Sequence, residues 1–298
     1  MSNLRQSFIS NLQVLAKRDD KIVLVVGDLG YSVIEEFQKS FPDRFINAGI
    51  SEQNMMGFAA GLALQGYKPY VYSIANFPTF RSAEQYRNDV DYNNLPIRVV
   101  AVGGGVSYGS AGYSHHAVQD FALMRSFPNT SIVAPSSSME LERFMLADEH
   151  KSPAYIRIGK AEPSAANQSD TWEIKEHGFS VLNSGPSKRA IVFSGALGDL
   201  PFKWIESMGY GDTNCDLISV YHWNRDEDRQ LRETLQSYET LVTIEDHLGP
   251  GGFGSFILEL TNSLKNKPLI QRVFLSPEVV GAVGSESYLL DKYLLLEK

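Results

Sequence analysis

One glutamate stands where a predicted helix begins beside a predicted cleft. Between Phe45 and Gly66 a short buried strand is followed by a tight turn at Gly49, and then by a helix with Glu52 in its first turn. In a parallel α/β sheet such a turn faces the cleft at the carboxyl ends of the strands. A carboxylate there is a candidate catalytic group. It is equally a helix-start carboxylate of the kind that the helix dipole favours, and this segment alone leaves both interpretations open.

The helix itself is predicted from local signals. Ser51 is a natural N-cap, because its hydroxyl can accept a hydrogen bond from a free N–H group of the first turn. Gly66 supplies a C-terminal stop. Apolar residues recur at three- and four-residue steps and form one helical face, which consists of Met55, Ala59, Leu62 and Ala63.

Two adjacent histidines end a glycine-rich loop that follows another predicted strand. His115 and His116 come after the irregular stretch 103–114, which opens with three glycines but lacks the G-x-G-x-x-G spacing of a dinucleotide site. Adjacent histidines rarely converge on one metal ion, and neither cysteines nor a third histidine is spaced to help, so we predict no metal site. At the end of such a loop, His115 is suited to acid–base work or substrate hydrogen bonding, unless it is merely exposed.

Three further side chains have two interpretations each. Phe77 and Phe80 follow a strand end, where they are either core aromatics or part of a binding site. Arg157 lies inside the apolar strand AYIRI. A buried guanidinium needs an anionic partner, which is either a substrate or a core carboxylate.

Strands alternating with helices predict an α/β fold of two domains, each a mainly parallel sheet flanked by helices. Apolar strand patterns lie at 21–29, 45–47, 68–75, 96–104, 130–135 and 153–158, and a second alternating set follows at 189–264. The sequence turns polar between them, with a hairpin expected around Trp172 and Phe179. We therefore predict a first domain at 1–160, a linker at 161–187 and a second domain at 188–298.

Composition restricts the class of protein. The 298 residues carry a formal charge of −8 and no basic stripe, which argues against a nucleic-acid partner. No apolar run approaches the length of a membrane span, and the N-terminus lacks the apolar core of a signal peptide. Cys215 is the only cysteine, which excludes an intramolecular disulfide. We expect a cytoplasmic protein without a membrane partner.

Taken together, these segments resemble the pyrimidine-binding half of transketolases. The matching stretches are, in order, RFINAGISEQNMMGFAAGLALQG, YSIANFPTF, YRNDV, GYSHHAVQD, VAPSS and YIRIGK, and LVTIEDHLGPGGFGS is similar to the transketolase C-terminal domain. Deoxyxylulose-phosphate synthases and the β subunits of 2-oxo acid dehydrogenases show a similar order. The resemblance covers nearly the whole chain, and it implies a pyrimidine-binding domain followed by a transketolase C-terminal-like domain.

The resemblance implies a role for each candidate residue. Glu52 matches the glutamate that hydrogen-bonds N1′ of the thiamine aminopyrimidine and thereby activates the cofactor. Phe77 and Phe80 fall where aromatics surround that ring, with Phe77 the favoured stacking residue. His115 matches the histidine that faces the donor ketose, His116 stands where a glutamine is usual, and Arg157 matches the strand arginine that binds substrate phosphate.

Two departures concern the substrate. Ala111 and Gly103 stand where transketolases carry an aspartate and a phosphate-binding histidine. The acceptor, or its phosphate, is therefore expected to be bound differently.

A third departure concerns the cofactor. The resemblance implies a Gly-Asp-Gly motif that holds the divalent metal (Mg²⁺ or Ca²⁺) of thiamine diphosphate, and the chain has only Gly27-Asp28-Leu29. We therefore expect the metal and diphosphate to be bound by an N-terminal transketolase subunit. An α2β2 assembly would follow, inactive without that partner.

Four hypotheses for function remain. The leading one is a subunit of a split, transketolase-like enzyme that transfers a two-carbon ketol unit between sugars or sugar phosphates. The alternatives within the resemblance are the β subunit of a 2-oxo acid dehydrogenase E1 component and a deoxyxylulose-phosphate-synthase-like enzyme. The last is a non-catalytic scaffold, which would not need Glu52, both phenylalanines and His115 together.

Overall fold

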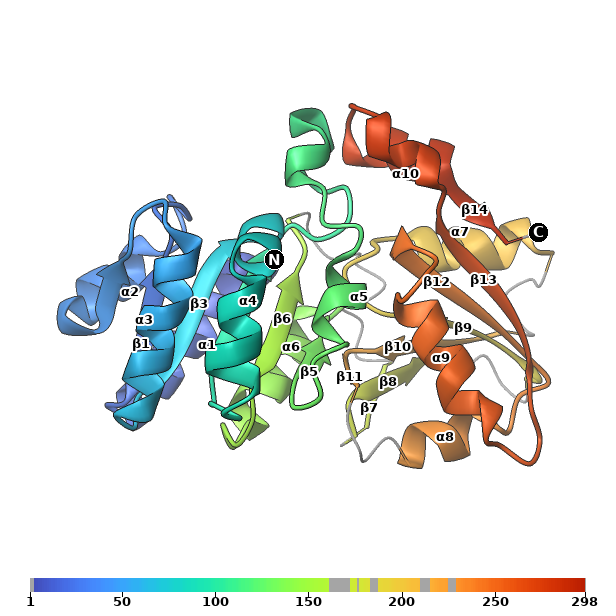
Figure 1. The fold of residues 1–298 in the computed structure, drawn as a ribbon. Coiled ribbons are helices and arrows are strands. Elements are labelled where there is room, and N and C mark those ends of the chain that lie inside the picture. The colour runs from blue at the N-terminus through green and yellow to red at the C-terminus, as the bar shows by residue number, and fades with distance from the viewer. Residues whose placement is uncertain are drawn as a thin grey trace.

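The part of the chain that the computed structural model describes forms two seven-stranded sheets that lie next to each other (Figure 1). The structure describes residues 3–160, 172–175, 177–182, 187–209, 215–224 and 229–297. Most of the predicted linker, at 161–171, 176 and 183–186, lies outside the described residues. Among the described residues, no helix combines the length and apolar character needed to cross a bilayer.

The first sheet has the order β11-β5-β6-β4-β3-β1-β2. All of its pairings are parallel except that of β11 with β5, which is antiparallel. The central strands are apolar runs buried on both faces, as a parallel sheet covered by helices requires. The strands are β1 (Ile22–Val26), β2 (Phe45–Asn47), β3 (Lys68–Ile74), β4 (Arg98–Val102), β5 (Ser131–Val133), β6 (Ala154–Ile158) and β11 (His222–Trp223).

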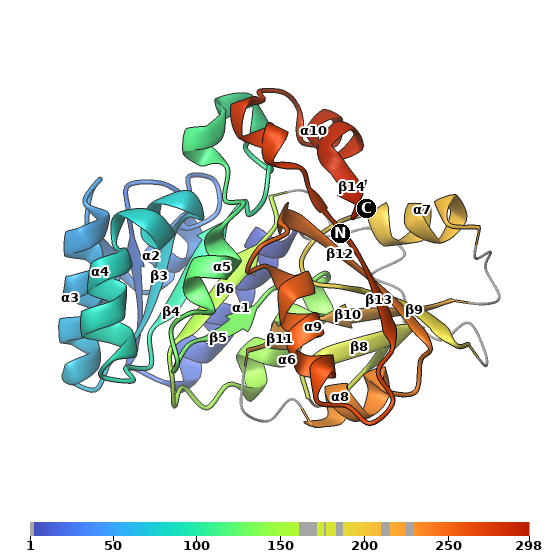
Figure 2. The ribbon, with the colours of Figure 1, turned by 45° about the vertical axis from the view of Figure 1, so that its right-hand side comes forward.

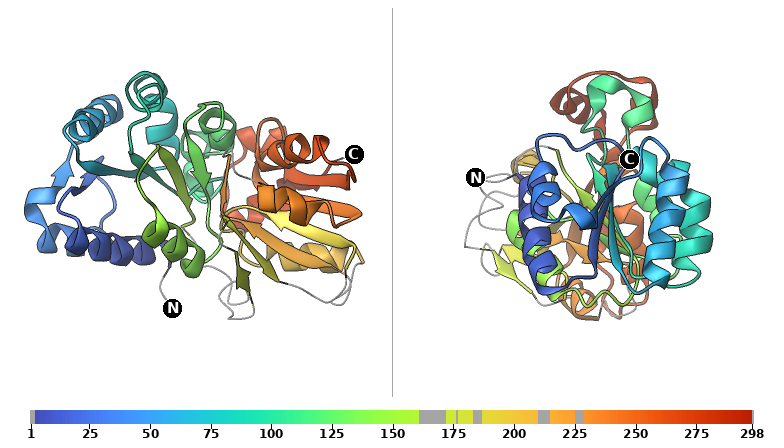
Figure 3. Two further views of the ribbon diagram at one scale, coloured as in Figure 1. Left: turned by 90° about the horizontal axis from the view of Figure 1, so that it is seen from below. Right: turned by 90° about the vertical axis from the view of Figure 1, so that its left-hand side faces the viewer.

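Helices cover both faces of this sheet (Figure 3). One face packs against α1 (Leu4–Arg18), α2 (Glu35–Ser40) and α6 (Ser138–Ala147). The other face packs mainly against α3 (Glu52–Leu64) and α5 (Asp120–Met124). Between β3 and β4 the chain forms two π-helical stretches around the short helix α4 (Ala83–Gln85), at Phe77–Arg81 and Tyr86–Asp91.

Both ends of α3 lie where the sequence predicts them, but the predicted capping bond is wrong. Ser51 occupies the N-cap position, yet its hydroxyl makes no capping hydrogen bond; it donates to the carbonyl of Ala48, 2.7 Å away, and so fixes the preceding turn. Gly66 ends the helix as predicted, with φ at +85°. The N–H groups of Gly66 and Tyr67 donate to the carbonyls of Ala63 and Leu62, which is a Schellman motif.

The second sheet has the order β14-β13-β12-β9-β10-β8-β7. Its centre is parallel, while β14, β8 and β7 pair antiparallel at the two edges. The strands are β7 (Glu173–Ile174), β8 (Phe179–Leu182), β9 (Arg189–Phe193), β10 (Asp216–Val220), β12 (Thr240–Leu248), β13 (Leu269–Leu275) and β14 (Leu294–Leu296). The helices are α7 (Leu200–Ser207), α8 (Arg229–Leu235), α9 (Phe253–Asn262) and α10 (Glu286–Tyr293). The hairpin expected around Trp172 and Phe179 is confirmed as β7 and β8.

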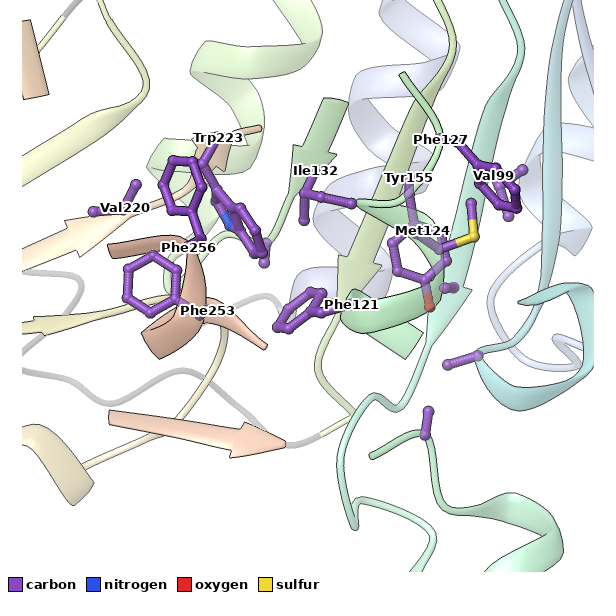
Figure 4. Packing of buried hydrophobic residues seen from close by; sticks show 14 of the residues in the cluster. Val99, Phe121, Met124, Phe127, Ile132, Tyr155, Val220, Trp223, Phe253 and Phe256 are labelled. Carbon is purple, nitrogen blue, oxygen red and sulfur yellow. The ribbon is translucent and has the colours of Figure 1, made fainter. Parts of the chain in front are cut away.

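An aromatic cluster fills the junction between the two sheets (Figure 4). The ring of Trp223 on β11 meets Phe121 of α5 edge-on at 5.2 Å, and it meets Phe253 and Phe256 of α9 at 5.4 and 4.9 Å. In sequence, β11 of the first sheet follows β10 of the second sheet. The chain therefore returns from the second sheet to the first and connects the two halves. We keep the two-domain division of 1–160 and 188–298 as a proposal.

One buried histidine, His150, leads us to predict that acid destabilises the fold. The Nε2 atom of His150 lies 2.8 Å from the hydroxyl of Tyr70. Burial, followed by the charge of Arg98, lowers the pKa of His150 from 6.5 to about 4. The folded state therefore resists a proton that the unfolded chain accepts, so the stabilising contribution is complete above pH 6.5 and is lost as the pH falls towards 4.

The free energy of unfolding should fall by up to about 3 kcal/mol across this pH range. Urea titrations at pH 7.5 and 5 should show a smaller loss of stability for His150→Asn than for the wild type, because asparagine has no group that titrates in this range. Asparagine also tolerates the left-handed φ of +51° at this position, so it replaces the histidine without backbone strain. An equal loss in both proteins would contradict the assignment to His150.

Candidate active site

Glu52 is a buried carboxylate at the start of α3. Its side chain is 3% exposed, and its Oε2 atom lies 3.0 Å from Nη1 of Arg81, which is 54% exposed. The turn at Gly49, with φ at +72°, brings the chain from β2 into the helix at the carboxyl edge of the sheet. The predicted placement of Glu52 at this edge is therefore confirmed.

Arg81 also contacts one of the two candidate phenylalanines. Its guanidinium lies 4.7 Å from the ring centre of Phe77, so a single arginine bridges Glu52 and Phe77. Phe77 and Arg81 are four residues apart in the π-helical turn Phe77–Arg81 that follows β3. Sequence reasoning missed Arg81, although its position directly after Phe80 places it in the same turn.

Phe80, in the same π-helical turn as Phe77, lines a cavity. It is 39% exposed and borders a cavity of about 360 Å³ together with Asn76, Tyr113, Ser114 and Gln119. Both phenylalanines therefore lie near the carboxyl edge of the first sheet.

The ring of His115 also contacts the ring of Phe77. The two rings meet edge-on with their centres 5.2 Å apart, and the ring of Tyr108 lies 6.3 Å from that of His115. The Nδ1 atom of His115 lies 3.0 Å from the hydroxyl of Ser114, whose carbonyl accepts a hydrogen bond of 2.6 Å from the side chain of Asn76. The loop after β4 is thus fastened to the turn after β3, and His115 stays partly exposed.

His116, in contrast, is buried. It is 1% exposed, and its Nε2 atom lies 3.4 Å from the carbonyl oxygen of Gly109. Burial lowers the pKa of its imidazole. The two neighbouring histidines therefore differ: His115 faces the edge of the sheet, and His116 is part of the packing of its own loop.

Arg157 is paired within the protein. Its guanidinium is 4% exposed and lies 2.9 Å from Oδ2 of Asp120 and 2.6 Å from Oδ1 of Asp246. Burial opposes the charge, but the two carboxylates outweigh burial and raise the pKa of Arg157 above its ordinary value. Of the two interpretations left open by the sequence, the structure shows the core carboxylate.

A second cavity, of about 680 Å³, lies elsewhere among the described residues. Its lining includes Arg98, Ser131 and Ala154, which start strands β4, β5 and β6 and therefore mark the opposite edge of the first sheet. Arg98 is held there by both oxygens of Asp148. None of the six candidate residues lines this cavity.

The candidate residues follow the order of the strands across the sheet. Glu52 comes after β2, Phe77 and Arg81 after β3, and His115 after β4. A buried carboxylate, an aromatic face and a partly exposed imidazole are thus connected by a continuous series of side-chain contacts. Such groups can hold a flat, nitrogen-containing ring against the carboxylate and present a proton donor or acceptor next to it. Among the described residues, no group of three potential metal ligands is found.

Comparison with known proteins identifies related sequences. The family described as "Transketolase, pyrimidine binding domain" matches residues 2–164. The chain is 29% identical to one of the subunits of the apulose-4-phosphate transketolase of Phocaeicola vulgatus, over 92% of this chain and 87% of that protein. It is 31% identical to the protein of the same description from Actinobacillus succinogenes, over 81% of this chain and 77% of that one.

A solved structure agrees over almost the full length. It is described as a split gene transketolase, inactive β4 tetramer, and superimposes with a TM-score of 0.79 at 27% identity. The match covers 97% of this chain and 92% of the solved one. The similarity therefore extends beyond the pyrimidine-binding domain to the second sheet.

Proposed function

This chain belongs to the transketolase family, and we propose that it is the pyrimidine-binding subunit of a split, thiamine-diphosphate-dependent enzyme. The enzyme would transfer a two-carbon ketol group between sugars. The observation that carries the proposal is the buried carboxylate of Glu52 with an aromatic ring, Phe77, one arginine away. The named relatives, which are transketolase subunits, support it.

The residues present fit an aminopyrimidine ring. A buried carboxylate next to an aromatic face suits a flat ring whose nitrogen shares a proton, because the carboxylate can form a hydrogen bond with that nitrogen while the aromatic face stacks on the ring. Thiamine diphosphate, when bound, supplies the nucleophilic carbon for the transfer of the ketol unit. Glu52 would hold the proton at the ring nitrogen, and Phe77 would stack on the ring.

His115 would bind the substrate beside this ring. It is partly exposed and contacts Phe77, so its imidazole can donate or accept a proton at a sugar oxygen. We propose Phe77, and not Phe80, as the stacking residue because it contacts both Arg81 and His115. A phosphate on the substrate would have to displace Asp246 to reach Arg157, so we do not assign Arg157 to the substrate.

The partner is proposed to bind the other half of the cofactor. The sequence lacks the Gly-Asp-Gly motif, and the solved relative is described as an inactive β4 tetramer of a split gene transketolase. We infer that an N-terminal transketolase subunit contributes the diphosphate and Mg²⁺ site, and that the active assembly is α2β2.

Calorimetric titration tests the shared site directly. Thiamine diphosphate and Mg²⁺ are titrated into this chain, into the partner, and into their mixture, with a Glu36→Gln mixture as a matched control. Glu36 is an exposed carboxylate in the first turn of another helix, so this variant should bind as the wild type does. We expect tight binding only in the mixtures, because each chain would supply half of the site. Tight binding to this chain alone would contradict the split site.

Substrate assays separate the remaining hypotheses. The mixture should cleave ketoses and pass the two-carbon unit to an aldose. Pyruvate decarboxylation with an artificial electron acceptor would instead indicate the dehydrogenase, and the absence of both activities despite cofactor binding would favour the scaffold. The relatives named above favour ketose cleavage.

A further inference from the structure

The loop that carries His115 is held by the second half of the chain. Figures 1 and 2 show the two short turns of this loop, at Gly109–Ala111 and Tyr113–His115, beside α10. The contacting segment runs from the 3-10 helix Pro277–Gly281 into α10 (Glu286–Tyr293). We call it the C-terminal clamp, residues 277–293.

Two hydrogen bonds join the clamp to the loop. The hydroxyl of Ser107 donates to Oε1 of Glu286 at 2.7 Å, and the N–H of Gly284 donates to the carbonyl of Gly109 at 3.2 Å. That same carbonyl lies 3.4 Å from Nε2 of His116. The clamp therefore bonds to the residue against which the buried histidine is fixed, directly next to His115.

The packing at Gly109 leaves no space for a side chain. A Cβ atom there would lie 2.5 Å from Cδ1 of Leu289 and 2.6 Å from the carbonyl oxygen of Gly284. Leu289 is fully buried, so it cannot move aside without disturbing its surroundings. Gly109 does not have a positive φ, so alanine suits its backbone and only the contact with the clamp excludes it.

The loop is therefore held from both sides. Asn76 fixes the carbonyl of Ser114 on the side of the first sheet, and the clamp fixes Ser107 and Gly109 on the other. Glu52 and Arg81 lie on other elements, α3 and the turn after β3, and pair with each other. A loosened clamp would thus displace His115 while Glu52, the carboxylate proposed to bind the cofactor, keeps its own support.

We propose that Glu286 is a positioning residue of the active site, and that the clamp places His115 for substrate binding by holding Ser107 and Gly109. This assignment rests on the proposed role of His115 in substrate binding. It gives the second half of the chain a part in the reaction, through the loop and without contact with the substrate.

The test uses four variants of the full chain in complex with its partner. Glu286→Ala removes the acceptor, and Gly109→Ala forces the loop away from the clamp. Glu286→Gln keeps an acceptor oxygen and should restore most of the lost function. Gly281→Ala is the matched control, because a Cβ there meets no atom within 4 Å.

Three measurements are made on each variant. We expect Glu286→Ala and Gly109→Ala to raise the KM for the ketose about ten- to a hundredfold while the affinity for thiamine diphosphate stays unchanged. Hydrogen–deuterium exchange should become faster in residues 103–116, and Gly281→Ala should match the wild type in all three measurements. A purely structural defect would weaken cofactor binding in parallel with ketose binding, and that result would overturn the proposal.

The exchange measurement separates this proposal from the proposed function. If the wild-type complex cleaves no ketose, the proposed function fails, and the positioning of His115 for a ketose fails with it. Faster exchange in the two variants would then still establish the contact that holds the loop. If the wild type is active but neither exchange nor KM changes in Glu286→Ala and Gly109→Ala, the positioning role is wrong and the proposed function stands.

Discussion

Replacing Glu52 with glutamine should lower the turnover of the assembled enzyme about 10²- to 10⁴-fold, the range of a lost general acid–base group. The amide has nearly the volume of the carboxylate and can still accept a hydrogen bond from Arg81, but it cannot hold the shared proton. Ketose cleavage by the mixture of subunits, measured at saturating cofactor, gives the effect on kcat.

The fold should tolerate this change. The amide keeps the volume of the carboxylate, and the arginine left without its charged partner is 54% exposed and therefore hydrated. Unfolding of the isolated chain by urea should therefore shift little. Glu36→Gln, a substitution of the same kind in an exposed first-turn carboxylate, should change neither turnover nor stability. Retained activity in Glu52→Gln would rule out its assignment to the cofactor.

The sequence predicts those features that depend on near neighbours. The α3 helix, its end at Gly66 and the strand before Glu52 follow from apolar spacing within one segment. The gathering of Glu52, Phe77 and His115 at one edge follows from the rule for parallel sheets, since each comes after a strand. The role of Ser51 could not be predicted, because its hydroxyl can either accept a hydrogen bond from the N–H groups of the helix or donate one to the carbonyl of Ala48.

Contacts between segments that are distant in sequence cannot be recognised from the spacing of apolar and polar residues. Asp246 is 89 residues from Arg157, in the other sheet, so nothing near Arg157 indicated which anion neutralises it. The clamp is a similar case: Ser107 and Glu286 are 179 residues apart, and no sequence signal joins a loop to a late helix. Sequence reasoning assigned no elements after residue 264, and therefore missed β13, α10 and β14.

We expect Arg157 to be essential for stability. The substrate-binding role that the resemblance implies does not require this, so the stability of a variant distinguishes the two roles. Arg157→Met removes the charge but keeps much of the side-chain volume, and it leaves Asp120 and Asp246 buried beside each other without their cation. Breaking a buried ion pair in this way typically costs about 3–5 kcal/mol. The hydroxyl of Tyr155 also donates to Asp120, so the disturbance should spread to β6 and α5.

Urea unfolding of the isolated chain measures this loss, with Arg87→Met on an exposed helical surface as the control. Arg87 is exposed and donates a hydrogen bond to its exposed neighbour Asn88, so its removal should change the free energy of unfolding by less than about 0.5 kcal/mol. Adding Asp246→Asn to Arg157→Met should recover part of the stability, because one of the two uncompensated charges is then gone. If Arg157→Met instead keeps its stability and only raises the KM for a phosphorylated sugar, the guanidinium faces the substrate in the assembled enzyme and the paired arrangement does not persist there.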